Sequence, residues 1–261
     1  MILAIDMGNT NIVVGGSDEQ QTYFVERITT NHGKTDLEYA INIKSILEIH
    51  QISTDAIEGA ILSSVVPPLN STILSAVKKI CGRTPMLVGS GMKTGLNILM
   101  DNPKTVGSDL IVDSVAALRD YPTPIIIIDM GTATTVCVVD KAGNYIGGVI
   151  LPGLKVSLDS LTSRTAQLPS ISLEAPTRVI GKNTIDCMRS GIVYGTVEMI
   201  DGILDRMEAE LGEPAHVVST GGLAQLIVPL CRHHITHDDS LLLKGLFILY
   251  QKNRDKAYTE Q

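Results

Sequence analysis

Two segments of the chain share one pattern: an aliphatic strand that ends in Asp-Met-Gly, a short polar turn, and a second strand rich in β-branched residues. Residues 2–14 read ILAIDMGNTNIVV, and residues 125–139 read IIIIDMGTATTVCVV. Asp6 and Asp129 hold the same place in the two copies, almost half of the 261-residue chain apart. A repeat with this spacing predicts two copies of one folding unit, because each half is long enough to form a domain.

The residues after each copy extend the match. Runs of β-branched residues bounded by Gly, Pro and Asn predict strands, and apolar residues spaced three and four positions apart predict helices. After the first copy these patterns predict a strand at 22–28, a helix over 35–50, a strand at 59–66 and a helix over 70–81. After the second copy they predict a strand at 145–151, a helix from 153, a helix over 184–211, a strand at 216–220 and helices to the end.

Two prolines mark the expected boundary between the halves. Pro122 and Pro124 follow a predicted helix, and proline ends a helix because it lacks an N–H and clashes with the preceding turn. We therefore expect two mixed-sheet α/β domains, residues 1–121 and 122–261, with a cleft between them.

The two turns suit the binding of polyphosphate and its metal. Glycine lets a turn approach a ligand closely, successive backbone N–H groups can point at oxygens, and a carboxylate can hold a cation directly or through water. A single turn of this composition is typical of an ordinary hairpin, but two matched copies favour the phosphate interpretation. The turn residues in question are Asp6, Gly8, Asn9 and Thr10 in the first copy and Asp129, Gly131, Thr132 and Thr134 in the second.

Composition and missing motifs narrow the function further. A net charge of −7 argues against a nucleic-acid partner, which needs a basic face. The absence of Trp and the presence of only 2 Phe exclude aromatic stacking platforms, and 4 widely spaced cysteines indicate neither a zinc cluster nor a disulfide framework. Neither a Walker A nor a GxGxxG loop occurs. No apolar run approaches the roughly 18 residues of a membrane span, so we expect a soluble, cytoplasmic protein without a membrane partner.

Several short motifs, in this order and spacing, resemble the type III pantothenate kinases of the acetate and sugar kinase, Hsp70 and actin superfamily, over nearly the whole chain. The motifs are Asp6-Met7-Gly8-Asn9-Thr10, Ser63-Ser64-Val65-Val66-Pro67, Lys93-Thr94-Gly95, Asp101-Asn102-Pro103, Val106-Gly107-Ser108-Asp109, Asp129-Met130-Gly131-Thr132-Ala133-Thr134-Thr135, Gly147-Gly148-Val149-Ile150-Leu151-Pro152-Gly153, Ser190-Gly191 and Thr220-Gly221-Gly222. The resemblance implies duplicated ribonuclease H-like domains of the actin-like ATPase kind. It also implies transfer of the ATP γ-phosphate to the hydroxyl of pantothenate, the first step of coenzyme A biosynthesis.

The same resemblance assigns roles to individual residues. The ATP contacts it implies are Asp6, Met7, Gly8, Asn9, Thr10, Asn11, Ile12, Val13, Thr132, Thr220, Gly221 and Gly222. The pantothenate contacts are Met100, Gly107, Ser108, Asp109, Leu110 and Thr184, with Asp109 as the proton acceptor. The cofactors are Mg²⁺, which accompanies ATP and reaches Asp6 through water, and a monovalent cation, K⁺ or NH₄⁺, at Asp129. The family's pantothenate site is completed across a subunit contact, which implies a homodimer.

Asp109 also has a structural interpretation. Acidic residues are common in the first turn of a helix, where their negative charge interacts favourably with the helix macrodipole. The sequence places Ser108 as an N-cap of that helix. From the dipole we expect a lowered pKa for Asp109, which keeps the carboxylate ionised at some cost in basicity.

Two positions depart from the family pattern. The family usually has Arg directly after the catalytic Asp and Tyr shortly before Asp-Asn-Pro, where this chain has Leu110 and Met100. Arg suits a substrate carboxylate through bidentate bonds that Leu cannot make, and Lys104 or Arg189 could compensate. The departures leave two alternatives open: a catalytically weak nucleotide-binding regulatory homologue, or a kinase of the same superfamily with another small hydroxylated substrate.

Overall fold

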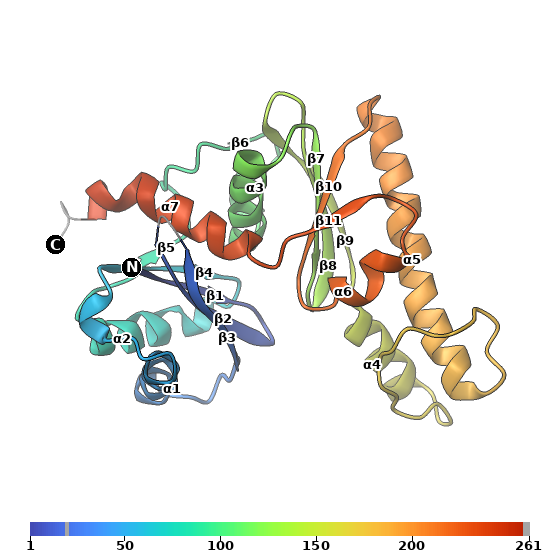
Figure 1. The fold of residues 1–261 in the computed structure, drawn as a ribbon, viewed down its shortest axis with the longest axis horizontal. Coiled ribbons are helices and arrows are strands. Elements are labelled where there is room, and N and C mark those ends of the chain that lie inside the picture. The colour runs from blue at the N-terminus through green and yellow to red at the C-terminus, as the bar shows by residue number, and fades with distance from the viewer. Residues whose placement is uncertain (19–20, 258–261) are drawn as a thin grey trace. The chain divides into compact units, whose positions relative to one another are not determined.

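The computed structural model describes residues 1–18 and 21–257, and the chain forms two compact units (Figure 1). The first unit contains residues 1–96, 102–116 and the segment from 240 onward, and the second contains residues 97–101 and 117–239. The division differs from the single boundary at 121/122 that we expected, because the chain passes between the units four times. The last helix groups with the first unit, since its apolar side chains pack on strands of that unit.

The first unit is built on a five-stranded sheet with the order β3-β2-β1-β4-β5. Its strands are β1 (Ile2–Met7), β2 (Asn11–Ser17), β3 (Thr22–Thr29), β4 (Gly59–Ser64) and β5 (Met86–Leu87). Its helices are α1 (Asp36–Ile49), α2 (Asn70–Cys81), α3 (Ser108–Asp120), whose last residues group with the second unit, and α7 (Leu241–Ala257). Short 3₁₀ turns lie at Thr54–Ala56, Pro67–Leu69 and Pro103–Thr105.

The second unit repeats this plan around a six-stranded sheet with the order β11-β10-β7-β8-β9-β6. Its strands are β6 (Asn97–Ile98), β7 (Ile125–Met130), β8 (Ala133–Val139), β9 (Asn144–Pro152), β10 (His216–Thr220) and β11 (Ile235–His237). Its helices are α4 (Leu154–Arg164), α5 (Thr184–Leu211) and α6 (Ala224–Ile227), followed by a 3₁₀ turn at Val228–Leu230. Apart from the added edge strand β6, the two strand orders are the same, which confirms the predicted duplication.

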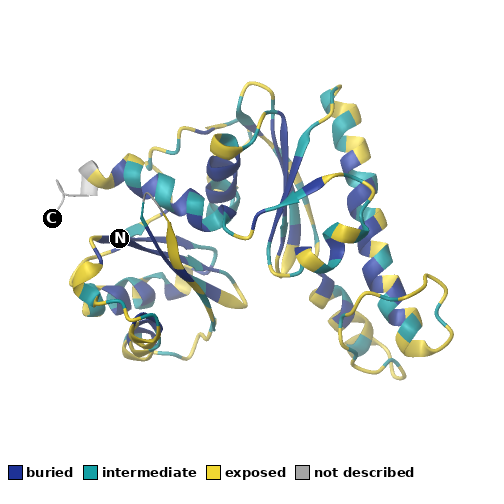
Figure 2. Ribbon diagram, in the orientation of Figure 1, coloured by how far each residue is buried: buried dark blue, intermediate teal, exposed yellow. Residues whose placement is uncertain are grey.

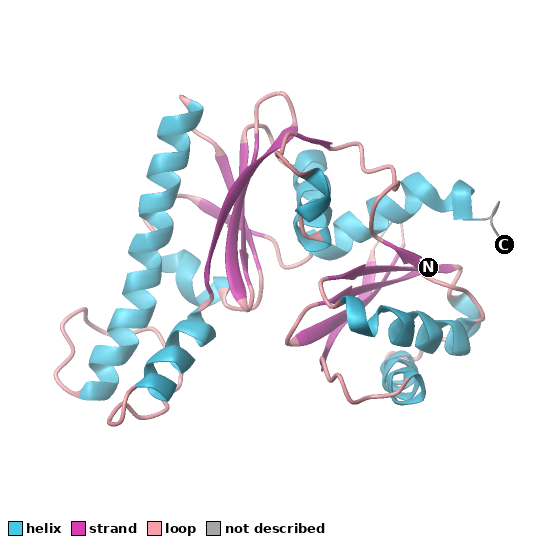
Figure 3. Ribbon diagram, turned by 180° about the vertical axis from the view of Figure 1, so that it is seen from behind, coloured by secondary structure: helices cyan, strands magenta, loops and turns pink. Residues whose placement is uncertain are grey.

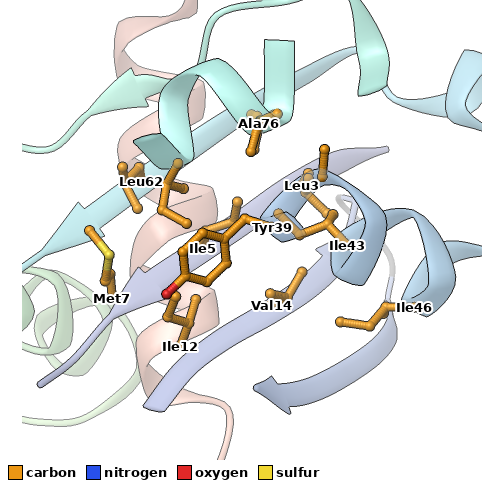
Figure 4. Close-up of a cluster of buried hydrophobic side chains, with 14 of the residues drawn as sticks. Leu3, Ile5, Met7, Ile12, Val14, Tyr39, Ile43, Ile46, Leu62 and Ala76 are labelled. Atoms are coloured by element: carbon orange, nitrogen blue, oxygen red, sulfur yellow. The ribbon is translucent and has the colours of Figure 1, made fainter. Parts of the chain in front are cut away.

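Period-two patterning explains both cores. In the first unit, Leu3, Ile5 and Met7 point to one face of β1 and pack with α1, as Figure 4 shows. The intervening positions, including Asp6, therefore point to the other face. Helices α1 and α2 lie together on the first face (Figure 3), while α7 packs against β1, β2 and β4.

The core of the second unit follows the same rule. Ile126, Ile128 and Met130 of β7 pack against α4 and the long helix α5, so Asp129 points to the opposite face. Helix α5 is buried on the side that meets the sheet and exposed on the other (Figure 2). Within the described residues, no helix combines the length and the apolar character needed to cross a membrane.

Candidate functional site

The first Asp-Met-Gly turn lies between β1 and β2 and is closed by backbone hydrogen bonds. The N–H of Gly8 donates to the carbonyl of Asn11 (3.0 Å). Thr30, just beyond β3, donates its hydroxyl to the Gly8 carbonyl (2.7 Å) and its N–H to the Thr10 carbonyl (3.0 Å). Asn9, Thr10 and Asn11 are exposed, so the backbone is held in place while these residues stay accessible to a ligand.

The start of α3 lies beside this turn. Asp6 pairs with Ser63 across the parallel strands β1 and β4, which puts both side chains on one face of the sheet. The Ser63 hydroxyl is 3.1 Å from that of Ser108, the first residue of α3. The structure therefore brings Asp109, the next residue, into the neighbourhood of Asp6 within one unit.

Ser108 does not act as the helix cap that we expected. Its hydroxyl accepts the Ser64 N–H (3.1 Å) and donates to the Ser64 carbonyl (3.0 Å). The first helical hydrogen bond is instead accepted by the Gly107 carbonyl from Ile111 (3.2 Å). The prediction failed because the sequence shows only the neighbours of Ser108 along the chain, whereas its partners lie 44 and 45 residues away.

The Asp109 carboxylate is partly buried and folds back on its own backbone. Its Oδ1 accepts the Leu110 N–H (2.9 Å), and a Cβ on Gly107 would overlap that same oxygen, so a side chain at position 107 would displace the carboxylate from this position. Burial raises the pKa of Asp109 above the ordinary value, although the hydrogen bonds to Leu110 and to its own N–H oppose the shift. The prediction of a lowered pKa, made from the helix dipole, was therefore wrong, because desolvation of the carboxylate by burial is the largest effect on this pKa. A raised pKa makes the carboxylate a better proton acceptor.

The second Asp-Met-Gly turn, between β7 and β8, is one residue shorter than the first, and the Gly131 N–H donates to the Ala133 carbonyl (3.0 Å). Asp129 pairs with Thr135 on one side and Thr220 on the other, so the three side chains share a face at one end of the sheet. Thr135 Oγ1 is buried and has no hydrogen-bond partner among residues 1–18 and 21–257.

Two glycines allow other segments to approach this second turn. Gly221 has a φ of +92°, and a Cβ there would lie 2.7 Å from Asp129 Oδ1 and from the Met130 nitrogen. Gly153, at the N-terminus of α4, packs against the carbonyls of Gly131 and Thr132. The structure thus brings the Thr220–Gly222 loop and the start of α4 close to the turn that contains Asp129 and Thr132.

Sequence reasoning gave no individual role to three residues that shape these turns. Gly153 and Ser63 occur in the motifs, but only their spatial neighbours show what they do. Thr30 follows a predicted strand, and its side chain reaches a turn 22 residues earlier. A local pattern could not identify Thr30, because its partner depends on strand pairing.

The remaining predicted residues lie on separate elements. Met100 is partly buried against Gly147 of β9, where a Cβ would lie 3.3 Å from its sulfur. Thr184 is the exposed first residue of α5. Arg189 donates to the carbonyl and the hydroxyl of Ser172 (3.1 and 2.8 Å), which commits its guanidinium to the loop before α5.

Comparisons with known proteins show the family of the chain. The family model described as type III pantothenate kinase matches residues 2–206. The chain belongs to the type III pantothenate kinase family. Type III pantothenate kinases from Halalkalibacterium halodurans and an Exiguobacterium species are 44% and 46% identical to it; each alignment covers 97% of this chain and 100% of the relative. A third, from a Geobacillus species, is 45% identical over 98% of this chain and 99% of its own length.

Solved structures show that this member of the family has the actin-like ATPase fold. Component A of (R)-2-hydroxyglutaryl-CoA dehydratase from Acidaminococcus fermentans superposes with a TM-score of 0.56 at 15% identity, covering 98% of both chains. MreB 5 of Spiroplasma citri, bound to AMPPNP, has a TM-score of 0.56 at 9% identity and covers 100% of this chain and 98% of its own. At these identities the likeness concerns the fold alone.

Proposed function

We propose that this chain transfers the γ-phosphate of ATP to the hydroxyl of pantothenate and so carries out the first step of coenzyme A biosynthesis. Family membership supports the reaction. The observation that carries the assignment of roles is the contact between Ser63 and Ser108, which sets the proposed base, Asp109, beside the Asp6 turn.

The proposed chemistry needs little from the protein beyond positioning and charge. Phosphoryl transfer has a loose transition state, so a base is needed only to accept the hydroxyl proton. Asp109 has a raised pKa and suits that role. The turn 8–11, with the Thr132 turn and the Thr220–Gly222 loop, would hold ATP, and Mg²⁺ bound with ATP would supply positive charge that an acidic chain lacks. Asp6 would reach that ion through water.

We also propose a monovalent cation, K⁺ or NH₄⁺, at Asp129. The residues fit such an ion: Asp129 provides a charged oxygen, and the cross-strand neighbour Thr135 has a buried hydroxyl with no partner in the described part of the chain. A buried hydroxyl without a partner costs free energy, which a cation there would offset.

For pantothenate we propose contacts from 107–110, Met100 and Thr184, and a homodimer in the cytoplasm. The second unit offers apolar side chains that a second copy would cover: Ile150 of β9 is 75% exposed and Ile180, before α5, is 81% exposed. Leu110 cannot bind the pantothenate carboxylate as an Arg would, so we expect weaker binding of that group.

One assay tests the proposal: ADP release with ATP, Mg²⁺ and K⁺, measured with and without pantothenate. We expect release that depends on pantothenate and falls when Na⁺ replaces K⁺. ATP binding without turnover would favour the regulatory homologue. Turnover only with another small hydroxylated acceptor would favour the second alternative. Equal rates in K⁺ and Na⁺ would remove Asp129 as the cation site and leave the reaction in place.

A further inference from the structure

We infer that two residues outside the reacting groups, Ser108 and Gly245, set the position of Asp109 and act as positioning residues for phosphoryl transfer. The inference rests on the proposed function, which makes Asp109 the base. Each residue joins α3 to a different part of the first unit: Ser108 to the end of β4 and Gly245 to the C-terminal helix α7.

The Ser108 hydroxyl anchors the first turn of α3 to the sheet. It accepts the Ser64 N–H and donates to the Ser64 carbonyl, and it lies 3.1 Å from the Ser63 hydroxyl. With both its donor and its acceptor capacity used on β4, this hydroxyl is engaged away from a substrate. The hydroxyl therefore holds the residue that follows it, and the pantothenate contact proposed for Ser108 falls to its backbone.

Gly245 limits the position of the same helix at a second point, Val112. It is buried in α7, and a Cβ at this position would overlap the carbonyl oxygen of Val112 and lie 2.7 Å from Val112 Cγ1. Packed carbon atoms sit about 3.5–4.0 Å apart. Helices α3 and α7 therefore approach as closely as they do only because residue 245 has no side chain.

Val112 is one turn of α3 beyond Asp109, about 4.5 Å along the helix axis at 1.5 Å per residue. A side chain at 245 would push Val112 away by about 1 Å, and a regular helix would pass that displacement to Asp109. A shift of about 1 Å in a reacting group can cost about 100-fold in rate. We thus expect the rate to depend on a glycine more than 130 residues from the base in sequence.

The test compares Gly245→Ala and Ser108→Ala with matched controls. Gly202→Ala introduces the same methyl group in α5, where nothing lies within 4 Å, and Ser160→Ala removes an exposed helical hydroxyl from α4. We expect kcat to fall about 100-fold in Gly245→Ala and about tenfold in Ser108→Ala, while the KM values for ATP and pantothenate change less than threefold. Both controls should keep the wild-type kcat.

Several results would overturn the inference. One is a folded Gly245→Ala protein with a kcat within twofold of wild type. Another is a loss in Ser108→Ala that appears in KM for pantothenate rather than in kcat, because the hydroxyl would then be a substrate contact. If Gly245→Ala shows no cooperative thermal transition, Ser108→Ala decides alone, and a kcat within twofold of wild type counts against the inference.

Hydrogen exchange separates this inference from the proposed function. If the wild-type chain shows no pantothenate-dependent turnover, the proposed function fails. Amide exchange at the start of α3 still reports on the two contacts: it should quicken in Gly245→Ala and Ser108→Ala but not in the controls. Unchanged exchange in both variants would reject the contacts as positioning features, whatever the activity.

Discussion

At the scale of single residues, Asp109 combines two conflicting demands. Its partly buried position in the first turn of α3 raises its pKa and makes it a better proton acceptor. The same burial makes the ionised form costly for the folded state, because the charge loses contact with water. Proton affinity and stability therefore oppose each other at this residue.

Asp109→Asn should lower kcat by about 10²- to 10⁴-fold, the usual contribution of a general base, and should also raise the melting temperature. The folded state binds the Asp109 proton more tightly than the unfolded state, so wild-type stability falls as pH rises from the ordinary Asp pKa through the raised one. The gain in melting temperature should therefore be absent at acid pH and appear above the raised pKa. Thermal melts across pH measure it.

The matched control is Asp55→Asn, an exposed residue in the first unit, which should change neither quantity. A melting-temperature difference between Asp109→Asn and wild type that is the same at every pH would contradict the assignment of the raised pKa to Asp109.

At the scale of elements, the buried carboxylate of Asp201 ties the loop before β11 to α5. Its side chain is 0% exposed and accepts the N–H groups of Arg232 (2.9 Å) and His233 (3.2 Å), and a ring nitrogen of His233 lies 2.8 Å away. Although burial opposes it, these hydrogen bonds lower the pKa of Asp201 below its ordinary value. The carboxylate thus accepts hydrogen bonds from loop N–H groups that lie outside the strands and helices.

Asp201→Ala should lower the free energy of unfolding by about 3 kcal/mol, because it removes a buried acceptor and leaves part-buried N–H groups of the loop without a partner. Asp205→Ala, one turn further along α5, removes a side chain that is 56% exposed and lies 3.2 Å from His233 Nε2. That change should lower the free energy of unfolding by only about 0–1 kcal/mol. Urea unfolding of both variants tests the contrast, and equal losses would show that burial of Asp201 is not the cause.

At the scale of the whole molecule, the C-terminal helix belongs to the unit that the N-terminal strands form. Helix α7 groups with the first unit and packs on β1, β2 and β4. Close approach is possible because glycines of the sheet meet large side chains of the helix: Gly15 meets Leu243, and Gly59 meets Tyr250. The first unit is therefore discontinuous in sequence and cannot be complete until the last helix is made.

A chain that ends at Asp239 should lose the first unit. The five large side chains that it removes are buried, and each contributes about 1.5–3 kcal/mol, a sum comparable with the whole stability of a domain; they are Leu241, Leu243, Leu246, Leu249 and Tyr250. Hydrogen exchange should show unprotected amides in β1 and β4 and protected ones in β7 and β10. Protected β1 and β4 amides in the truncated chain would contradict this, and the 240–261 peptide should restore protection.

The sequence by itself determined the repeat, the Asp-Met-Gly turns and the elements around them. The helices over 70–81 and 184–211 have the predicted bounds, and the strand predicted at 59–66 ends two residues earlier. These features follow from patterns of neighbouring residues, since period two and period three to four depend only on which face of an element is buried.

Only the tertiary structure decided where α7 belongs, what Ser108 contacts and which way the pKa of Asp109 moves. Each of these depends on partners distant in sequence: β1 and β4 for α7, Ser63 and Ser64 for Ser108, and the surroundings that bury Asp109. Local sequence predicted a cap and a lowered pKa because it contains the helix but not the protein around it. Burial raises the pKa of Asp109 instead, and hydrogen bonds to Ser64 engage the Ser108 hydroxyl that would have formed the cap.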